Sequence, residues 1–199
     1  MEYRELLETS MQYLRCPICS AAEDLEFDQL SKLQYEVTVD AKLRQQNASD
    51  GGFCTLHFRR FRKLANTQTN ALMLQALYED WRRDKNLRFG SRCIVCKENE
   101  MHEKNLLTSF ASSLYDENFY ERFRASAGLC FEHQQEVSQL LQEPSKAVQL
   151  GQLHEEQLEK LMHTVEKMIN ARYFETRDLE RRSIPCVIEK FVGRKALGL

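Results

Sequence analysis

Six of the seven cysteines and two of the five histidines form a pattern that could bind metal ions. The pair Cys16 and Cys19 is followed 35 positions later by Cys54 in the segment GFCTLH, and the pair Cys93 and Cys96 is followed 34 positions later by Cys130 in GLCFEH. Thiolates and imidazoles are preferred ligands of structural zinc, which takes four of them in a tetrahedron. The candidate ligands are therefore Cys16, Cys19, Cys54, His57, Cys93, Cys96, Cys130 and His133.

The two series, CxxC and then GxCxxH, indicate an internal duplication. The CxxC pairs are offset by 77 positions and the third cysteines by 76. The flanking residues agree, since Asp40 aligns with Asp116 and Leu43 with Phe119. We therefore predict a first repeat over residues 1–85, a second over 86–150 and a C-terminal extension over 151–199.

Each repeat supplies three cysteines and one histidine, so the simplest arrangement is one Cys3His site per repeat. Joining the CxxC pair of one repeat to the CxxH pair of the other is the alternative, and spacing does not choose between them. Two Zn²⁺ ions fit these ligand types. Two [4Fe–4S] clusters, which also take four ligands, are the alternative cofactor. A thioredoxin-like redox role is disfavoured because no βαβ pattern surrounds either CxxC pair.

The elements that must position these ligands are predicted to be helices, and the fold class is all-α. Only 7 glycines and 3 prolines occur in 199 residues, whereas sheet proteins need many turn residues. Apolar residues recur at helical spacing. We expect one long helix or two shorter ones between the motifs of the first repeat, a last short helix from Pro185, and helices over residues 3–14, 53–84, 97–113, 116–124, 129–142 and 145 to about 178.

Composition excludes several classes of protein. The formal net charge of −2 disfavours a nucleic-acid binder, and the basic run at 59–63 is typical of a solvated helix face. No apolar run is long enough to span a membrane, and the N-terminus lacks the features of a signal peptide. We therefore expect a cytoplasmic protein with no membrane contact, and homo-oligomerisation stays open. His102, His154 and His163 are assigned to polar helix surfaces, and Cys186 has no counterpart in the duplication.

The duplicated motifs, together with the C-terminal segments ARYF at 171–174 and IEKFVG at 188–193, resemble a bacterial family of unknown function. The resemblance implies a small, uncharacterised helical protein in which the eight candidate ligands are signature positions. It implies no activity.

These observations predict a zinc-stabilised helical protein that acts as a binding or adaptor module for a protein partner. The alternative is an iron–sulfur redox carrier or accessory protein. Enzymatic activity is disfavoured, because a catalytic zinc usually has three protein ligands and an open position, whereas four candidates are available at each site.

Overall fold

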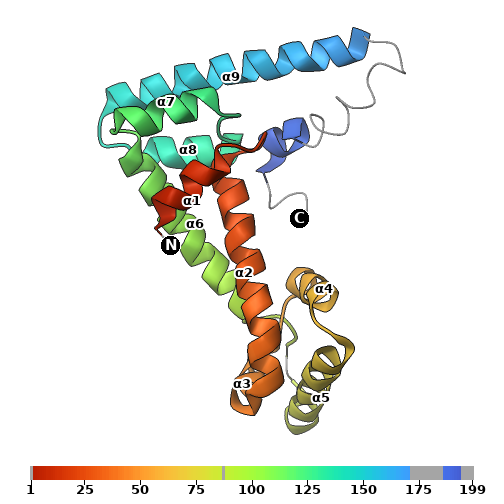
Figure 1. Ribbon diagram of the computed structural model, residues 1–199. Helices are drawn as coiled ribbons and strands as arrows, with labels where there is room; N and C mark the ends of the chain where they lie inside the picture. The colour runs from red at the N-terminus through yellow and green to blue at the C-terminus, as the bar shows by residue number, and fades with distance from the viewer. Residues whose placement is uncertain (1, 87, 171–185, 194–199) are drawn as a thin grey trace. The chain divides into compact units, whose positions relative to one another are not determined.

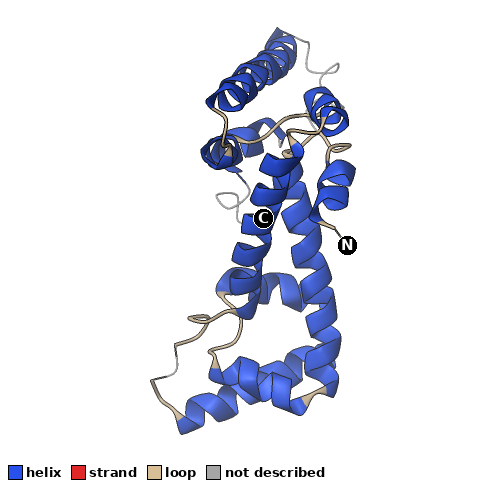
Figure 2. Cartoon of the chain, turned by 90° about the vertical axis from the view of Figure 1, so that its left-hand side faces the viewer, coloured by secondary structure: helices blue, strands red, loops and turns tan. Residues whose placement is uncertain are grey.

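The computed structural model describes residues 2–86, 88–170 and 186–193, and within these ranges the regular structure is helical with no strand (Figure 1, Figure 2). This confirms the all-α prediction. Residues 186–193 form a short helix without a label in Figure 1. The labelled helices are α1 (Tyr3–Ser10), α2 (Pro17–Val39), α3 (Ala41–Ser49), α4 (Thr55–Leu64), α5 (Thr67–Arg83), α6 (Ile94–Ser113), α7 (Glu117–Ala125), α8 (Phe131–Leu140) and α9 (Pro144–Asn170).

One predicted helix is divided in the structure. The helix expected over residues 53–84 is broken between α4 and α5, where Ala65 is extended and the side chain of Asn66 accepts a hydrogen bond from the Thr69 N–H. An asparagine at this position caps the next helix by satisfying one of its free amide groups. The segments 171–178 and Pro185, to which helical structure was also assigned, lie outside the described residues.

The order of the helices agrees with the predicted duplication. The series α2, α3, α4 and α5 of the first repeat corresponds to α6, α7, α8 and α9 of the second. Asp40 caps α3 by accepting from the N–H groups of Lys42 and Leu43, and Asp116 caps α7 by accepting from the N–H of Phe119. The aligned aspartates therefore have the same structural role in both repeats.

The chain divides into two compact units that do not follow the order of the repeats. Unit 1 contains residues 1–22 and 103–199, and unit 2 contains residues 23–102, so α2 and α6 each contribute to both. The repeat boundaries themselves stay a prediction. In unit 1, α1 packs against α7, and α8 against α9. In unit 2, α3 packs along α5.

Each unit has its own apolar core. In unit 1, the ring of Phe110 meets Phe119 and Phe123 edge to face, and all three side chains are buried. In unit 2, side chains from α2, α4, α5 and the start of α6 form one cluster: Leu30, Leu33, Val37, Phe53, Phe61, Ala65, Met73, Cys93 and Val95. Among the described residues, no helix is sufficiently long and apolar to cross a membrane.

Candidate metal centres

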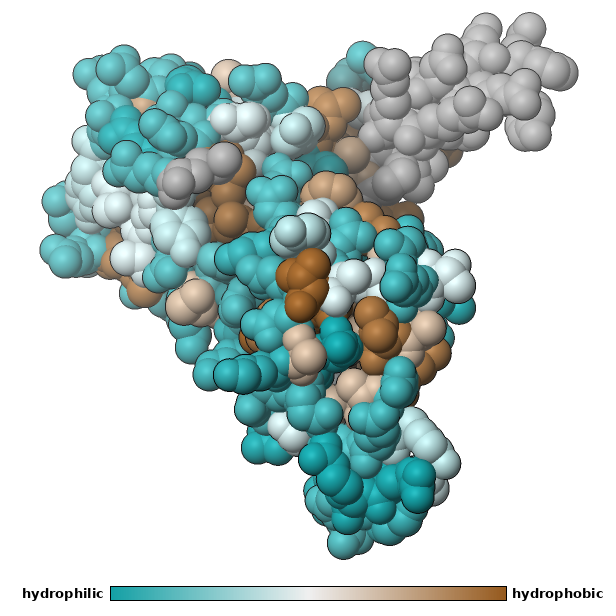
Figure 3. All heavy atoms as spheres, turned by 60° about the horizontal axis from the view of Figure 1, so that its bottom comes forward, coloured by the Kyte–Doolittle hydropathy of each residue, from teal (hydrophilic) through white to brown (hydrophobic). Residues whose placement is uncertain are grey.

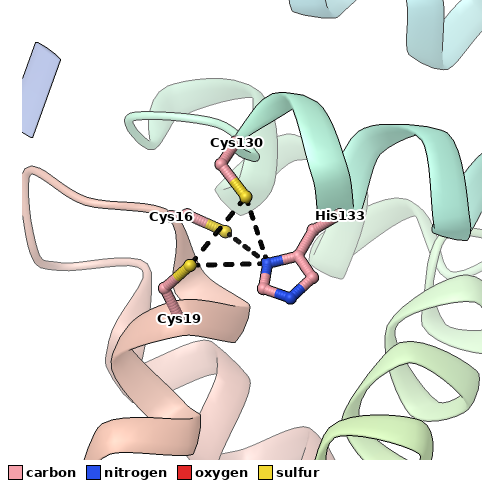
Figure 4. A group of neighbouring side chains, drawn as sticks. All are labelled: Cys16, Cys19, Cys130 and His133. Atoms are coloured by element: carbon pink, nitrogen blue, oxygen red, sulfur yellow. Dashed lines mark hydrogen bonds between the residues drawn. The ribbon is translucent and has the colours of Figure 1, made fainter. Parts of the chain in front are cut away.

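The eight candidate ligands lie in two groups that could each hold a metal ion. Cluster A, in unit 1, consists of Cys16, Cys19, Cys130 and His133, all of them buried. Figure 4 shows the three thiols and the ring of His133 converging on one point. The Nδ1 atom of His133 lies 3.3 Å from the sulfur of Cys16, 3.4 Å from that of Cys19 and 3.3 Å from that of Cys130.

Cluster B, in unit 2, repeats this arrangement with Cys54, His57, Cys93 and Cys96. The Nδ1 atom of His57 lies 3.2 Å from the sulfur of Cys54, 3.4 Å from that of Cys93 and 3.3 Å from that of Cys96. Whereas His57 and Cys93 are buried, Cys54 and Cys96 are half-buried. This difference in exposure separates the two clusters.

The simpler pairing of the ligands is wrong, because each cluster joins the CxxC pair of one repeat to the CxxH pair of the other. Helix length explains the exchange. At about 1.5 Å per residue, α2 carries the chain roughly 30 Å from Cys19 to its end at Val39, and α3 is too short to bring it back before Cys54. The second repeat has the same long and short helices, α6 and α7. Neither repeat can therefore close a site alone, and each completes the other.

Both clusters form where two helices begin. Cys54 and Cys130 are the N-cap residues of α4 and α8, and each histidine lies in the first turn of the same helix. Cys16 and Cys93 directly precede α2 and α6, whose first turns contain Cys19 and Cys96. The N-terminus of a helix attracts negative charge and lowers the pKa of a nearby thiol. Two such ends at each cluster therefore favour the thiolate form that a metal ion requires.

Gly52 and Gly128 shape the chain just before each CxxH pair. Their φ angles are +70° and +74°, in the left-handed region that only glycine adopts without strain. A Cβ atom would also lie 2.8 Å from the Leu77 side chain at Gly52 and 2.9 Å from the Lys190 amine at Gly128. The positive φ angles therefore favour glycine at both positions, and a larger residue would also have to displace the side-chain ends of Leu77 at Gly52, or of Gln157 and Lys190 at Gly128.

The distances between ligand atoms fit a single tetrahedral ion. Zinc bonds of about 2.3 Å to sulfur and 2.0–2.1 Å to nitrogen place two sulfurs about 3.8 Å apart, and a sulfur and a nitrogen about 3.5 Å apart. The sulfurs of Cys19 and Cys130 lie 3.9 Å apart and those of Cys54 and Cys96 lie 3.7 Å apart, with sulfur–nitrogen distances of 3.2–3.4 Å in both clusters. The side chains of each cluster could therefore share one ion.

Sequence reasoning missed a glutamate beside each histidine. The Nε2 atom of His133 lies 3.1 Å from a carboxylate oxygen of Glu103, and that of His57 lies 3.5 Å from one of Glu26. A carboxylate that accepts from Nε2–H fixes the ring and leaves Nδ1 to the metal, a common arrangement at metal-binding histidines. Each glutamate lies seven positions after the second cysteine of a CxxC pair. The register of the duplication was therefore the signal that could have identified them.

The ionisable groups of each cluster perturb one another. Burial alone would raise the pKa of the Cys93 thiol, but its hydrogen bond with His57 lowers that pKa to about 6. For His57, burial opposes protonation, yet hydrogen bonds with Cys93 and Glu26 raise its pKa to about 9. In cluster A the pKa of Cys16 is likewise lowered, against the effect of burial, by hydrogen bonds from Cys130 and Cys19. The second cysteine of each CxxC pair shows the opposite shift, because hydrogen bonds with Cys130 and Cys16 raise the pKa of Cys19, and burial, followed by the charge of Cys93, raises that of Cys96. The metal-free clusters therefore favour the thiolate at Cys16 and Cys93 but not at all their sulfurs, whereas a bound cation would favour the thiolate at each ligand.

The helix at residues 186–193 packs beside cluster A within unit 1. The guanidinium of Arg15 donates two hydrogen bonds to the Glu189 carboxylate, at 2.6 and 2.7 Å. The buried Lys190 amine donates to the Ala127 carbonyl, and Phe191 lies 5.3 Å from the ring of Phe131. Cys186 is half-buried and belongs to neither cluster.

The assignment of His154 to a polar surface is wrong, whereas His163 is exposed as expected. His154 is buried on α9, with its ring 5.0 Å from that of Phe131. Burial first, and then the charge of Lys190, lower its pKa to about 4. The helical spacing of apolar residues did not predict the burial of His154. His154 directly follows the buried Leu153 on α9, at the place where the helix 186–193 packs on α8 and α9.

Comparison with known proteins identifies a sequence family of unknown function. The family described as "Family of unknown function (DUF6062)" matches residues 5–90. This confirms the resemblance to an uncharacterised family. The matched segment contains Cys16, Cys19, Cys54 and His57, which supply half of cluster A and half of cluster B. No curated protein and no solved structure matches the chain.

Proposed function

We propose that the protein is a zinc-stabilised helical protein that serves as a binding or adaptor module. The metal part of this proposal rests on one observation. In each cluster three sulfurs and one Nδ1 atom lie at the separations of a tetrahedral zinc site, while the second ring nitrogen faces a glutamate. Zn²⁺ is preferred to other divalent ions because it combines tetrahedral geometry with thiolate and imidazole ligands.

The same distances argue against an iron–sulfur carrier. In a [4Fe–4S] cluster each ligand binds a different iron at its own corner, so the ligand atoms must stand much farther apart than atoms that share one ion. The sulfurs, which lie 3.7 and 3.9 Å apart, match ligand atoms that share one ion. Opening either cluster to hold four irons would require α2 and α8, or α4 and α6, to separate at their first turns.

A structural role suits sites in which protein side chains supply all four ligands. A catalytic zinc keeps a position for water or substrate, but each cluster offers four protein ligands. Each cluster also joins segments far apart in the chain, since Cys19 and Cys130 are 111 residues apart. Structural zinc sites contribute about 10–16 kcal/mol of apparent binding free energy in small modules, so an ion at each cluster would stabilise the unit around it.

An adaptor role is supported by the apolar side chains that unit 2 leaves at its surface. Tyr78 is 57% exposed, Phe89 61% and Leu74 54%. Scattered exposed apolar residues need no explanation, but a contiguous apolar patch with a polar rim is typical of a protein-binding surface. These three residues line one pocket.

Metal analysis of the untagged protein, prepared with and without oxygen, tests the metal assignment. We expect two zinc ions per chain, colourless protein, and a marked loss of helicity and melting temperature in a strong chelator. The Cys186→Ser variant should keep both ions. Stoichiometric iron with absorption at about 400 nm, the region of thiolate-to-iron transitions, would replace zinc by the cluster alternative. An unchanged melting curve after complete metal removal would contradict the stabilising role.

A further inference from the structure

Unit 2 contains an open apolar pocket of about 570 Å³ between the start of α4 and the outer face of α5. Apolar and aromatic side chains form most of the wall, and Arg59 is its one charged residue. Figure 3 shows apolar residues at the surface among mostly hydrophilic ones on the face that it presents. The lining residues are Gly51, Phe53, Thr55, Phe58, Arg59, Leu74, Leu77, Tyr78, Trp81 and Phe89, and we call this surface the α4–α5 groove.

The duplication gives the groove a counterpart in unit 1. Helices α4 and α8 start 76 positions apart, and α5 and α9 start 77 apart. The buried positions Met73, Ala76 and Asp80 of α5 fall, at that offset, on Leu150, Leu153 and Gln157 of α9, which are buried too. Thr55 and Leu77 in the groove therefore correspond to Phe131 and His154.

In unit 1 this counterpart surface is covered by a helix. Residues 186–193 place Phe191 against the ring of Phe131, and the charge of Lys190 acts on His154. In unit 2, no helix within the described ranges covers Thr55 and Leu77, which line the open groove. The same kind of surface thus has a helix on it in one unit and none in the other.

The charged contact that holds the covering helix also has a counterpart. Arg15, directly before Cys16, donates two hydrogen bonds to Glu189 of the helix 186–193. Arg92 directly precedes Cys93 and aligns with Arg15 in the duplication. The Arg92 side chain is 69% exposed, where it lies 3.4 Å from Asp50 and reaches the Ser49 carbonyl. A carboxylate on a docked helix could compete for this guanidinium.

The charge around the groove defines the chemistry of its occupant. Residues 53–92 contain nine basic and three acidic residues, although the whole chain has a formal net charge of −2. Lys85 lies over the ring of Trp81 at 3.6 Å, and Arg82 over that of Tyr78 at 6.0 Å, so cations border the aromatic wall. An occupant with apolar anchors and flanking carboxylates complements this surface.

We propose that the α4–α5 groove binds an acidic amphipathic helix of another protein, with an aromatic or aliphatic anchor inserted beside Thr55 and Leu77. This inference rests on the proposed adaptor role and names its partner chemistry. Helix-in-groove recognition uses anchors three and four positions apart on one helix face. The chain's own 186–193 helix is already held in unit 1 by Glu189 and the buried Lys190, so this helix does not fill the groove of unit 2.

The single tryptophan reports on the groove directly, because Trp81 lines it and is 38% exposed. The probe is a synthetic stapled helix with one phenylalanine, leucines three and four positions away, and glutamates on both flanks. One comparison peptide carries lysines in place of the glutamates. A second contains the same residues as the acidic helix in a scrambled order that removes the apolar face. We expect the acidic helix to change Trp81 emission and to bind at least roughly tenfold more tightly than either comparison peptide.

Variants locate the binding. Leu74→Glu places a carboxylate in the lining, and Arg59→Glu reverses the one charge in the wall. Both residues are exposed, so the zinc content and helicity of each variant should match those of the unmodified protein. Both variants should weaken binding of the acidic helix at least roughly tenfold. Val148→Glu, at an apolar side chain 61% exposed on α9, is the matched control and should leave binding unchanged.

Other outcomes overturn the proposal in distinct ways. Equal binding of all three peptides would show that the groove has no specificity for an acidic helix. Saturable binding of a single-stranded oligonucleotide, lost in Arg59→Glu, would assign the surface to nucleic acid. A dimer seen by sedimentation and abolished by Leu74→Glu would assign it to a second copy. If two zinc ions are bound but no peptide binds, the groove inference fails and the zinc assignment stands. If the peptide binds to a protein that contains no zinc, the zinc assignment fails and the groove inference stands.

Discussion

The two clusters have the same donor set in very different surroundings. In cluster A all four ligands are buried, and the helix 186–193 packs beside them through Glu189 and Lys190. In cluster B two of the four cysteine and histidine ligands are half-buried. The two clusters therefore share the groups that a metal site would need, three sulfurs, one nitrogen and a glutamate on the histidine, and they differ in what encloses these groups.

The charges beside the two histidines have also diverged. Arg60 pairs with Glu26 near His57, and Asn99 donates to the same glutamate at 3.0 Å. The residue that aligns with Arg60 is Glu136, which lies with Glu103 beside His133. A positive side chain thus borders the histidine of cluster B, and a second carboxylate borders that of cluster A. Because cluster A is buried and cluster B is partly exposed, we expect cluster B to be the more reactive of the two.

The largest expected effect is the loss of one ligand from the buried cluster. Cys130→Ser should remove one of two zinc ions and destabilise unit 1 by several kcal/mol, a large part of the roughly 10–16 kcal/mol that a structural zinc supplies. Cys54→Ser should cost less, because a half-buried serine stays partly solvated and water can complete the coordination. Zinc stoichiometry and hydrogen exchange of each unit measure the difference.

Cys186→Ser is the matched control for these variants, since Cys186 is half-buried and belongs to neither cluster. It should retain both ions. If Cys54→Ser destabilised the protein as strongly as Cys130→Ser, the distinction between a buried and an accessible site would be wrong.

A pH effect should distinguish the covered surface of unit 1 from the open groove of unit 2. His154 has a pKa of about 4, against about 6.5 for a free histidine. Because the unfolded state binds the proton more readily, His154 reduces stability as the pH falls from about 6.5 towards 4, by up to about 3 kcal/mol. His154→Leu introduces the residue type of the aligned Leu77 and should remove this loss of stability at low pH.

Urea unfolding of the two proteins between pH 7.5 and 4.5 tests the effect. Both keep the same metal ligands, so acid release of zinc contributes equally and cancels in the difference. The advantage of His154→Leu should grow as the pH falls; a difference independent of pH would mean that packing alone distinguishes the two side chains.

The glutamates beside the histidines should affect metal affinity. Glu103→Gln and Glu26→Gln keep the size of the side chain but remove the carboxylate that accepts from Nε2–H. Loss of such a partner typically reduces metal affinity 10–100-fold. Competition with a chromogenic chelator measures each affinity. Glu100→Gln, at an exposed position of α6, is the control and should change neither site. Full affinity in both variants would reduce the two glutamates to ordinary polar contacts.

Thiol reagents should react with the two clusters at different rates. Cys54 and Cys96 are half-buried, whereas all three cysteines of cluster A are buried. We expect N-ethylmaleimide to release the ion of cluster B at least roughly tenfold faster, because reactivity follows exposure of the thiolate. Peptide mapping of the alkylated cysteines against time separates this reaction from that of Cys186. Simultaneous alkylation of both clusters would contradict the comparison.

The sequence was sufficient to predict the helical class and to single out the eight residues that the structure gathers into two clusters, because helical periodicity and repeated Cys/His spacing are local signals. The pairing of the CxxC and CxxH motifs could not be predicted from spacing, since it depends on where in space α2 and α6 end. The break after Leu64 was missed for a local reason. The apolar periodicity continues through it, and the cap at Asn66 is a single residue within a helical pattern.

The open groove and the covered counterpart were also beyond sequence reasoning. Phe191 and Phe131 are 60 residues apart, and no spacing rule relates them. Glu26 and Glu103 are a different case, because their common register was present in the sequence. A duplication thus identifies equivalent positions, but contacts such as that of Arg15 with Glu189 decide what each position does.

The smallest expected difference concerns the aligned helix caps, Asp40 and Asp116. Replacing an aspartate N-cap by alanine costs about 1 kcal/mol, since an amide group of the first turn loses its acceptor. Asp116 also lies 3.1 Å from Arg4, and the hydrogen bond from Phe119, followed by that from Arg4, lowers its pKa. Asp116→Ala thus loses one cap bond and an ion pair, whereas Asp40→Ala loses two cap bonds, so the two costs should differ only slightly. Asparagine can still cap a helix but carries no charge, so Asp40→Asn should be nearly neutral, while Asp116→Asn should retain only the small deficit due to Arg4.

Denaturant unfolding at low and high salt separates the two contributions, because salt screens the exposed ion pair and leaves the cap unchanged. Identical costs at every salt concentration would mean that the two caps are equivalent in energy as well as in position.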